Sequence, residues 1–193
     1  MKFVLASGSP RRKELLKDLG LSFEICPSNA EESFEKNMTF YEICESLSSL
    51  KATDVFNSFT QEEEVCVIGA DTIVVCGDNV LGKPKDETDA FNMLKLLQNR
   101  SHFVYTGTTV IIKQRNNIKK ITYSDKTEVF MVKLSDEEIK SYVKSGEPMD
   151  KAGSYAIQGK GAAFIDKIYG NYFNVVGLNI CRLYELLKEN SLV

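Results

Sequence analysis

The sequence of 193 residues contains no tryptophan and a single histidine, His102. A catalytic triad that depends on histidine, or a histidine-rich metal site, is therefore not expected. The five cysteines are scattered and odd in number, and no two of them form a CxxC pair. This spacing argues against a zinc site and favours reduced thiols in an intracellular protein.

Long hydrophobic runs and blocks of like charge are missing as well. No apolar segment approaches the ~20 residues that span a bilayer, and the apolar start of the chain is too short for a signal peptide. The 24 basic and 27 acidic residues give a net charge of −3, with no run that suggests a surface for nucleic acid or membrane. We expect a cytoplasmic protein, a single domain over residues 1–193, that binds neither nucleic acid nor membrane.

The most informative stretch is residues 65–75, a continuous apolar run rich in β-branched residues. It predicts a strand buried on both faces, with one carboxylate, Asp71, in its middle. A buried carboxylate is costly to hold, so Asp71 should be paired, metal-bound or protonated. A turn signal at residues 77–79 predicts a hairpin that would carry Lys83 back to within a few residues of Asp71. Taken alone, this pattern is most simply a core strand with an ion pair.

The N-terminal segment predicts a strand over residues 2–6, a tight loop over residues 7–9 and then a helix. Ser9 is placed to cap that helix, and Pro10 takes the favoured first position. Arg11 and Arg12 stand in the first turn, where positive charge opposes the helix dipole. A bound anion would resolve the conflict, because helix N-termini attract anions. A solvated basic turn explains the same residues equally well.

The remaining pattern alternates strands and helices, which is typical of an α/β fold. Apolar residues at helical spacing predict a helix over residues 38–56, and Ser135 with Glu138 forms a capping box that starts another, ending near Ser145. A final helix is expected after Asn179. The expected strands are 21–26, 102–105, 108–113, 118–123, 127–133 and 164–169.

A glycine-rich, basic segment covers residues 153–163. The pattern Gly153…Gly159-Lys160 is close to a phosphate-binding P-loop. Its spacing is one residue too long, and no serine or threonine follows Lys160. We therefore reject a Walker motif.

Three separated segments resemble one family, the Maf proteins, which are nucleoside triphosphate pyrophosphatases related to the inosine triphosphatase group. The segment from Ser7 to Leu16 is similar to their N-terminal signature. Residues 69–72, with Gly82-Lys83-Pro84, are similar to the second block, and residues 150–159 to the third. Weaker matches lie at Ser28 with Glu32, and at residues 51–52, 105–107 and 174–178. The resemblance covers nearly the whole chain, and three long motifs in the right order are highly specific.

This resemblance implies an elongated, two-lobed α/β fold in which a central bent mixed sheet borders a long cleft. It implies hydrolysis of nucleoside triphosphates between the α- and β-phosphates, giving a monophosphate and pyrophosphate. A divalent cation, Mg²⁺ or Mn²⁺, is the implied cofactor. The nucleotide is the expected partner, and the oligomeric state stays open, with a homodimer as one option.

The resemblance also assigns roles to individual residues. Asp71 matches the proton acceptor, and we expect it to hold the metal together with Glu32. Lys83 would stabilise the developing charge and keep Asp71 ionised. The positions tied to substrate choice are Arg12, Thr72 and Gln158. Other substrate-binding positions are Ser7, Ser9, Arg11 and Lys51.

The arginine at position 12 and the glutamine at position 158 resemble the branch of the family that acts on dTTP and UTP. The amide of Gln158 suits the imide edge of uracil or thymine, because it offers both a donor and an acceptor. CTP, modified pyrimidine nucleotides and the clearing of non-standard nucleotides fit the same branch. The alternatives are a nucleotide-binding regulator of cell division with little hydrolysis, or a pyrophosphatase for a methylated or non-standard purine triphosphate. Two features depart from the family pattern: Asn179, where proline is usual, and the long polar connection over residues 57–64.

Overall fold

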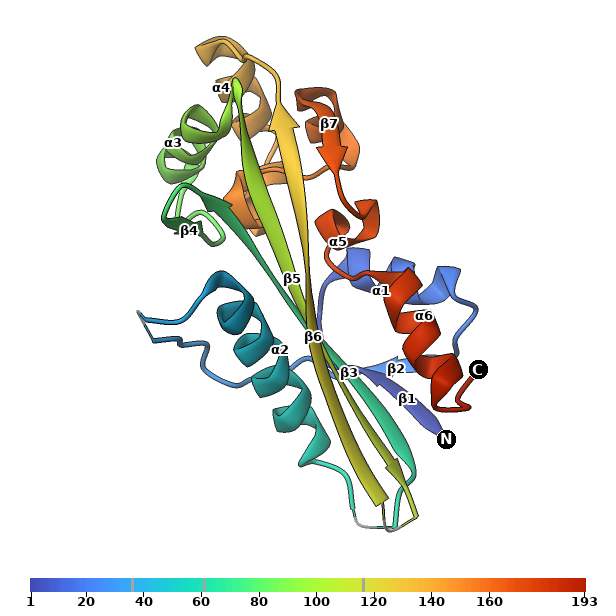
Figure 1. Ribbon diagram of the computed structural model, residues 1–193. Coiled ribbons are helices and arrows are strands. Elements are labelled where there is room, and N and C mark those ends of the chain that lie inside the picture. Colours follow the sequence, from blue (N-terminus) through green and yellow to red (C-terminus); the bar gives the residue numbers. More distant parts are fainter. Residues whose placement is uncertain (36, 61, 116) are drawn as a thin grey trace. The chain divides into compact units, whose positions relative to one another are not determined.

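A computed structural model describes residues 1–35, 37–60, 62–115 and 117–193. Lys36, Gln61 and Asn116 lie outside the described residues, and Gln61 belongs to the polar connection over residues 57–64. The described chain forms a seven-stranded mixed sheet in the order β2-β1-β3-β5-β6-β7, with β4 paired to β3 (Figure 1). The expected α/β class with a mixed sheet is therefore confirmed.

The strands are β1 Lys2–Leu5, β2 Phe23–Ile25, β3 Val65–Cys76, β4 Asn79–Leu81, β5 Arg100–Gln114, β6 Asn117–Met131 and β7 Ile165–Tyr169. The α-helices are α1 Pro10–Asp18, α2 Phe40–Phe56, α3 Glu87–Leu97, α4 Asp136–Lys144, α5 Tyr172–Val176 and α6 Ile180–Glu189. Three 3₁₀ helices, η1 Glu147–Asp150, η2 Ala152–Ser154 and η3 Gly159–Phe164, lie between α4 and β7. None of the helices in the described ranges combines the length and apolar character that a membrane crossing demands.

The chain forms two compact units. The first comprises Met1–Asp71, Thr106–Asp125 and Gly177–Val193, and the second comprises Thr72–Tyr105 and Lys126–Val176. Strands β3, β5 and β6 each contribute residues to both units. This division agrees with the expected two lobes. The cleft, and the treatment of residues 1–193 as a single domain, stay predictions.

In the first unit, β1 lies between β2 and β3 and runs parallel to both. Valines from β1 and β3 pack with Ala52 and Val55 of α2 in a buried apolar cluster. Two glycines let α2 approach the sheet closely. A Cβ on Gly69 of β3 would lie 2.6 Å from the Ser48 carbonyl oxygen, and one on Gly107 of β5 would lie 2.1 Å from that of Cys44. The helix backbone therefore packs directly on the strands, as glycine within a strand often indicates.

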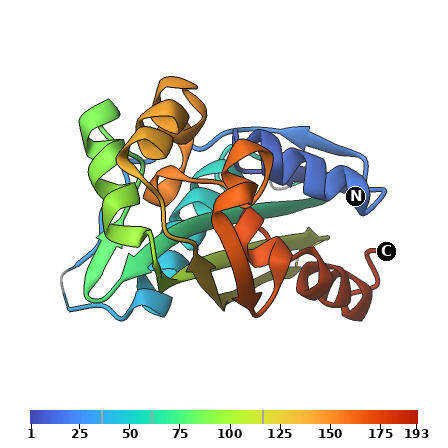
Figure 2. The ribbon, with the colours of Figure 1, turned by 90° about the horizontal axis from the view of Figure 1, so that it is seen from above.

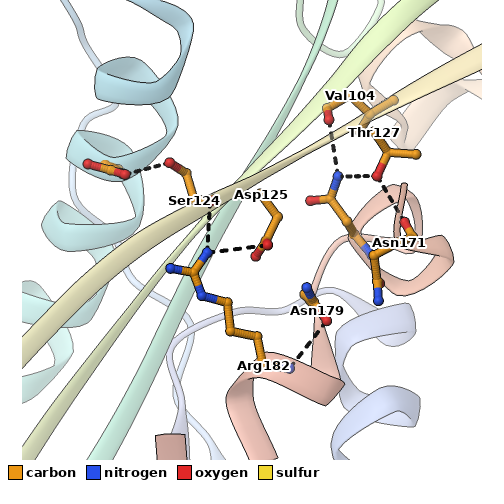
Figure 3. Close-up of polar contacts among 9 residues, drawn as sticks. Val104, Ser124, Asp125, Thr127, Asn171, Asn179 and Arg182 are labelled. Carbon is orange, nitrogen blue, oxygen red and sulfur yellow. Dashed lines mark hydrogen bonds and ion pairs between the residues drawn. The ribbon is translucent and has the colours of Figure 1, made fainter. Parts of the chain in front are cut away.

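Polar contacts fix the same helix and strands further. The hydroxyl oxygen of Ser48 is 2.9 Å from the hydroxyl oxygen of Thr109 on β5. The same Thr109 oxygen is 3.0 Å from the hydroxyl oxygen of Thr122 on β6. On α6, Arg182 donates from Nη1 to the Ser124 carbonyl and to Asp125 Oδ1 (Figure 3). Because these bonds join separate segments, the hydroxyl contacts hold α2 against the strands and the Arg182 bonds hold α6 against β6.

In the second unit, α3 and α4 lie side by side (Figure 2). Leu94 and Leu97 of α3 meet Ile139 of α4 and Val129 of β6 in a buried apolar cluster. The buried Asn174 of α5 donates from Nδ2 to the Val104 carbonyl at 3.1 Å and to Thr127 Oγ1 at 2.9 Å, which joins α5 to β5 and β6 (Figure 3).

Several predicted elements are confirmed, and the strands predicted within β5 and β6 were too short. The strand over residues 65–75, the hairpin after it, the cap at Ser9 and the helix after Asn179 are all present. The predicted breaks at residues 106–107 and 124–126 are wrong, because β5 and β6 run through them. Helix α5 was not predicted.

Candidate functional site

Asp71 lies on β3, three residues beyond the point where β1 stops pairing with that strand. Leu5, the last residue of β1, pairs in parallel with Ile68 of β3, and the Ala6 N–H donates to the Ile68 carbonyl at 2.8 Å. Strand β1 then leads into the Ser7–Ser9 loop and α1, while β3 continues to Asp71. The carboxyl end of a parallel strand is the usual place for a ligand site in an α/β sheet.

Two acidic side chains share one ammonium group at this place. Lys51 Nζ of α2 lies 2.6 Å from Asp71 Oδ1 and 2.8 Å from Glu32 Oε1. The side chains of Asp71 and Lys51 are only 10% and 14% exposed, whereas that of Glu32 is 52% exposed. Burial raises the pKa of the Asp71 carboxyl, and the positive charges of Lys51 and Arg12 limit the rise. Asp71 is therefore a carboxylate of increased basicity, held beside cations.

Helix α2 positions two members of this ion-pair cluster: Lys51 directly, and Glu32 through the loop that carries it. Lys51 stands one turn after Ser48, which is fixed against the sheet by Gly69 and the hydroxyl contacts. Asp54, a further turn along, accepts hydrogen bonds from the Ser28 hydroxyl at 2.7 Å and the Asn29 N–H at 3.0 Å. These bonds hold the loop that carries Glu32. Sequence reasoning missed Asp54, although its spacing of three from Lys51 places the two on one helix face.

Arg12 has defined partners within the first unit. Its Nε donates to the Gly177 carbonyl at 2.8 Å and its Nη1 to Ser7 Oγ at 3.0 Å. Burial lowers the pKa of the Arg12 guanidinium, and the nearby Asp71 charge offsets part of that change. The Ser9 hydroxyl accepts from the Arg12 N–H at 3.5 Å and so caps α1, whose first turn contains no acidic residue. Arg11 is half-buried in the same turn.

The other predicted residues belong to the second unit. Thr72 follows Asp71 directly on β3. The ladder between β3 and β4 pairs Val74 with Leu81, so the chain turns back along β3, and Lys83 is exposed two residues beyond its end. Gln158 is half-buried and comes directly before η3. The pairing of Asp71 with Lys51 was not foreseen, and the approach of Lys83 and Gln158 to Asp71 stays a prediction.

The donor chemistry of Asp71 and Glu32 fits a divalent cation. Within the described ranges, no three or more histidine, cysteine or acidic side chains gather in a way that could hold a metal. Asp71 and Glu32 supply two hard oxygen donors around one shared cation, the Lys51 ammonium. Mg²⁺ is commonly held by one or two carboxylates, with phosphates and water completing its shell. Two carboxylates are therefore a sufficient protein contribution.

Comparison with known proteins places the chain in a family. The model of the family described as Maf-like protein matches residues 2–190. A dTTP/UTP pyrophosphatase of Thermoanaerobacter sp. (strain X514) is 53% identical, with 98% of this chain and 96% of the relative covered. Another from Acetivibrio thermocellus is 48% identical, with 98% and 95% covered, and one from Lachnoclostridium phytofermentans is 46% identical, with 97% and 94% covered. A solved structure of a nucleoside-triphosphatase / dITP/XTP pyrophosphatase from Mycobacterium abscessus aligns over 98% of this chain and 97% of its own, with 12% identity and a TM-score of 0.44. The family match along nearly the whole chain, supported by these relatives, means that this protein belongs to the Maf family.

Proposed function

We propose that this protein hydrolyses pyrimidine nucleoside triphosphates, with dTTP and UTP as preferred substrates, to the monophosphate and pyrophosphate. The observation that carries the proposal is the buried Asp71, whose Oδ1 lies 2.6 Å from the Lys51 ammonium and whose pKa, raised by burial, is limited by the Lys51 and Arg12 charges. The names of the relatives, dTTP/UTP pyrophosphatases at 46–53% identity, supply the reaction and the substrate class.

The triphosphate would bind through the cations and N–H groups of the first unit. Lys51 and Arg12 carry positive charge beside Asp71, and the capped first turn of α1 offers backbone N–H groups without a competing acidic residue. Charge-assisted hydrogen bonds of this kind are about twice as strong as neutral ones. Ser7, Ser9 and Arg11 complete the proposed phosphate-binding residues, and Lys83 would add a further cation.

Asp71 would act as the general base. A water molecule attacks the α-phosphorus, its proton passes to the Asp71 carboxylate, and the bond to the bridging oxygen breaks so that pyrophosphate leaves. A raised pKa favours this role, because a base is most effective when its pKa lies near the working pH. Mg²⁺ or Mn²⁺ held by Asp71 and Glu32 would supply charge neutralisation at the phosphates.

Pyrophosphate release from a panel of triphosphates tests the proposal directly. The panel contains dTTP, UTP, CTP, the purine triphosphates, and methylated and deaminated bases, each with Mg²⁺ and with Mn²⁺. We expect dTTP and UTP to give the highest kcat/KM, with monophosphate and pyrophosphate in equal amounts. Release of orthophosphate instead, or binding without any hydrolysis, would contradict the proposal, and the second outcome would favour the nucleotide-binding regulator.

The Gln158→Glu variant tests the proposed reading of the base. An ionised glutamate only accepts hydrogen bonds, so the donor that a glutamine amide offers to a base carbonyl is lost. We expect kcat/KM for UTP and dTTP to fall about 100-fold, because a site built for a polar edge discriminates strongly. Steady-state kinetics with UTP and CTP measures the change, and the melting temperature should stay within about 3 °C of the parent, since Gln158 is half-buried. An unchanged order of substrates would remove Gln158 from base recognition.

The Lys51→Met variant tests the electrostatic coupling to Asp71. The Lys51 ammonium lowers the pKa of Asp71, so its loss should raise that pKa further above 3.8. Asp71 acts as a base only when ionised, and the acid limb of the pH profile of kcat/KM should therefore move to higher pH, by about one unit or more. Lys51→Arg keeps the charge and should keep the limb near its parental position. Coincident limbs in all three proteins would show that Asp71 is not the titrating base.

A further inference from the structure

Glu147 makes a set of contacts in the second unit that the proposed chemistry does not use. This residue begins η1, and both of its carboxylate oxygens accept hydrogen bonds. The Lys160 N–H donates to Oε2 at 3.1 Å, and the Gly161 N–H donates to Oε1 at 3.1 Å. The hydroxyl of Tyr142 donates to Oε1 at 3.0 Å. One carboxylate thus occupies consecutive backbone donors of the glycine-rich segment that directly follows Gln158.

The fit between this carboxylate and the turn is close. A Cβ on Gly159 would lie 2.9 Å from Glu147 Oε1 and 3.0 Å from Oε2, and Gly159 also has a positive φ of 68°. The positive φ therefore favours glycine there, and a Cβ at this position would displace the Glu147 carboxylate from the turn. Burial opposes ionisation of Glu147, yet the N–H groups of Gly161 and Lys160 outweigh it and hold the pKa of the carboxyl below its ordinary value. The group is consequently an anion at neutral pH.

Glu147 is itself anchored to the core of its unit. Its Oε1 partner Tyr142 comes from α4 and is only 4% exposed. The Tyr142 ring packs edge-on against Phe164 of η3, with 5.0 Å between ring centroids. The Glu147 carbonyl also accepts a hydrogen bond from Lys151 Nζ at 2.6 Å. These contacts connect the turn after Gln158 to buried residues of the unit.

We propose that Glu147 is a positioning residue that fixes the turn at residues 159–161 and thereby the base-reading amide of Gln158. The inference rests on the proposed function, because it takes Gln158 as the reader of the base. The inference also names the acceptor of two backbone N–H groups of the glycine-rich segment, those of Lys160 and Gly161. Successive N–H groups in such a turn commonly cradle a phosphate, but here the internal carboxylate takes them. The segment therefore supports base recognition and leaves phosphate binding to the first unit.

Glu147→Gln tests this role with the size of the side chain preserved. The neutral amide offers one oxygen in place of two, so at least one backbone donor of the turn loses its acceptor. We expect KM for UTP and dTTP to rise about tenfold and the preference for UTP over CTP to fall about tenfold, the size of one hydrogen bond to a charged group. The value of kcat should stay within about threefold of the parent, because Asp71 and its cations are unchanged. Inorganic tripolyphosphate, used as a competitive inhibitor, should keep its inhibition constant.

Two further variants separate positioning from a general loss of stability. Glu138→Gln is the matched control, because Glu138 also accepts a backbone hydrogen bond in the second unit, from the Ser135 N–H in the capping box of α4. It should leave KM and the UTP preference unchanged. Tyr142→Phe removes one donor to Glu147 and should shift both quantities in the same direction by a smaller factor. Hydrogen exchange of the Lys160 and Gly161 amides should become faster in Glu147→Gln and remain unchanged in Glu138→Gln.

The outcomes for Glu147→Gln and Tyr142→Phe decide whether Glu147 positions Gln158. An unchanged UTP preference in Glu147→Gln would overturn the inference, and so would a changed inhibition constant for tripolyphosphate, since the freed donors would then belong to the phosphate site. If Glu147→Gln does not fold, Tyr142→Phe decides, and an unchanged preference in that variant overturns the inference. If the parent releases no pyrophosphate from any triphosphate, the proposed function has failed, which is a different result from an active parent whose variants keep their preference.

Discussion

The Asp71→Asn substitution is expected to lower kcat about 10³-fold or more while nucleotide still binds. General base assistance is worth about 10²–10⁴ in rate, and the amide of asparagine cannot take the proton from water. The cations Lys51 and Arg12 and the capped turn of α1 remain, so the triphosphate keeps its binding groups. Pyrophosphate release measures kcat, and isothermal titration calorimetry with UTP measures binding.

The stability of the Asp71→Asn variant separates a catalytic role from a structural one. Because the folded-state pKa of Asp71 is raised above 3.8, the folded state favours the protonated carboxyl. Any stabilisation from this group is complete below the unfolded pKa and is lost as pH rises through the folded pKa. At pH 7 the ionised carboxyl therefore costs folding free energy, which a neutral amide removes. We expect a melting temperature at pH 7 within about 3 °C of the parent, or higher.

Asp125→Asn is the matched control for that experiment. Asp125 is also an ion-paired aspartate of the first unit, with 20% of its side chain exposed and its Oδ1 3.3 Å from Arg182. It has no place in the proposed chemistry, so kcat should stay within about twofold of the parent. Wild-type-like turnover in Asp71→Asn would remove Asp71 from the mechanism. Equal losses of activity in both variants would point to the unit's structure as the cause.

Local sequence signals were sufficient for elements that are specified locally. The apolar run of β3, the cap at Ser9 with Pro10 and the Ser135–Glu138 capping box each appear where the residues indicate. A break in β6 was predicted because Asp125 and Lys126 are poor strand residues by local criteria. The prediction was wrong, since β6 runs through both residues. Their partners are distant in sequence: Asp125 pairs with Arg182, and the ammonium of Lys126 lies 3.8 Å from the centroid of the Phe103 ring. Tertiary contacts here override local preference.

The candidate site also depends on tertiary contacts that local sequence patterns do not predict. The motifs identified Asp71 as the central carboxylate, but the nearest cation in the sequence pattern was Lys83, across the hairpin. The structure pairs Asp71 with Lys51, twenty residues earlier on α2. Packing of α2 on β3 and β5 brings this lysine to the strand, and no local pattern encodes a contact between a helix and a strand so far apart. Gly69 and Gly107 were the available signal, since a glycine inside a strand often marks the approach of another backbone.

Gly107→Ala is therefore expected to have the largest effect on stability. The new Cβ would lie 2.1 Å from the carbonyl oxygen and 2.3 Å from the carbonyl carbon of Cys44, and 2.7 Å from the Glu45 nitrogen. All three are backbone atoms of α2, so no side chain can rotate away and the helix itself has to move. Overpacking of a core costs about 1–3 kcal/mol and occasionally more. We expect about 3 kcal/mol, which lowers the melting temperature by about 6–12 °C for a chain of this size.

Displacement of α2 also reaches the candidate site, because Lys51 stands on that helix. A shift of about 1 Å in a catalytic group can cost about 100-fold in rate, and we expect kcat/KM for UTP to fall by that factor at temperatures where the variant is folded. Thermal unfolding and steady-state kinetics on the same preparation measure both effects. Gly8→Ala controls for stability alone, since its Cβ would make an ordinary contact of 3.6 Å with Pro27. If Gly107→Ala melts like Gly8→Ala, the close packing of α2 on β5 is not what holds Lys51 beside Asp71.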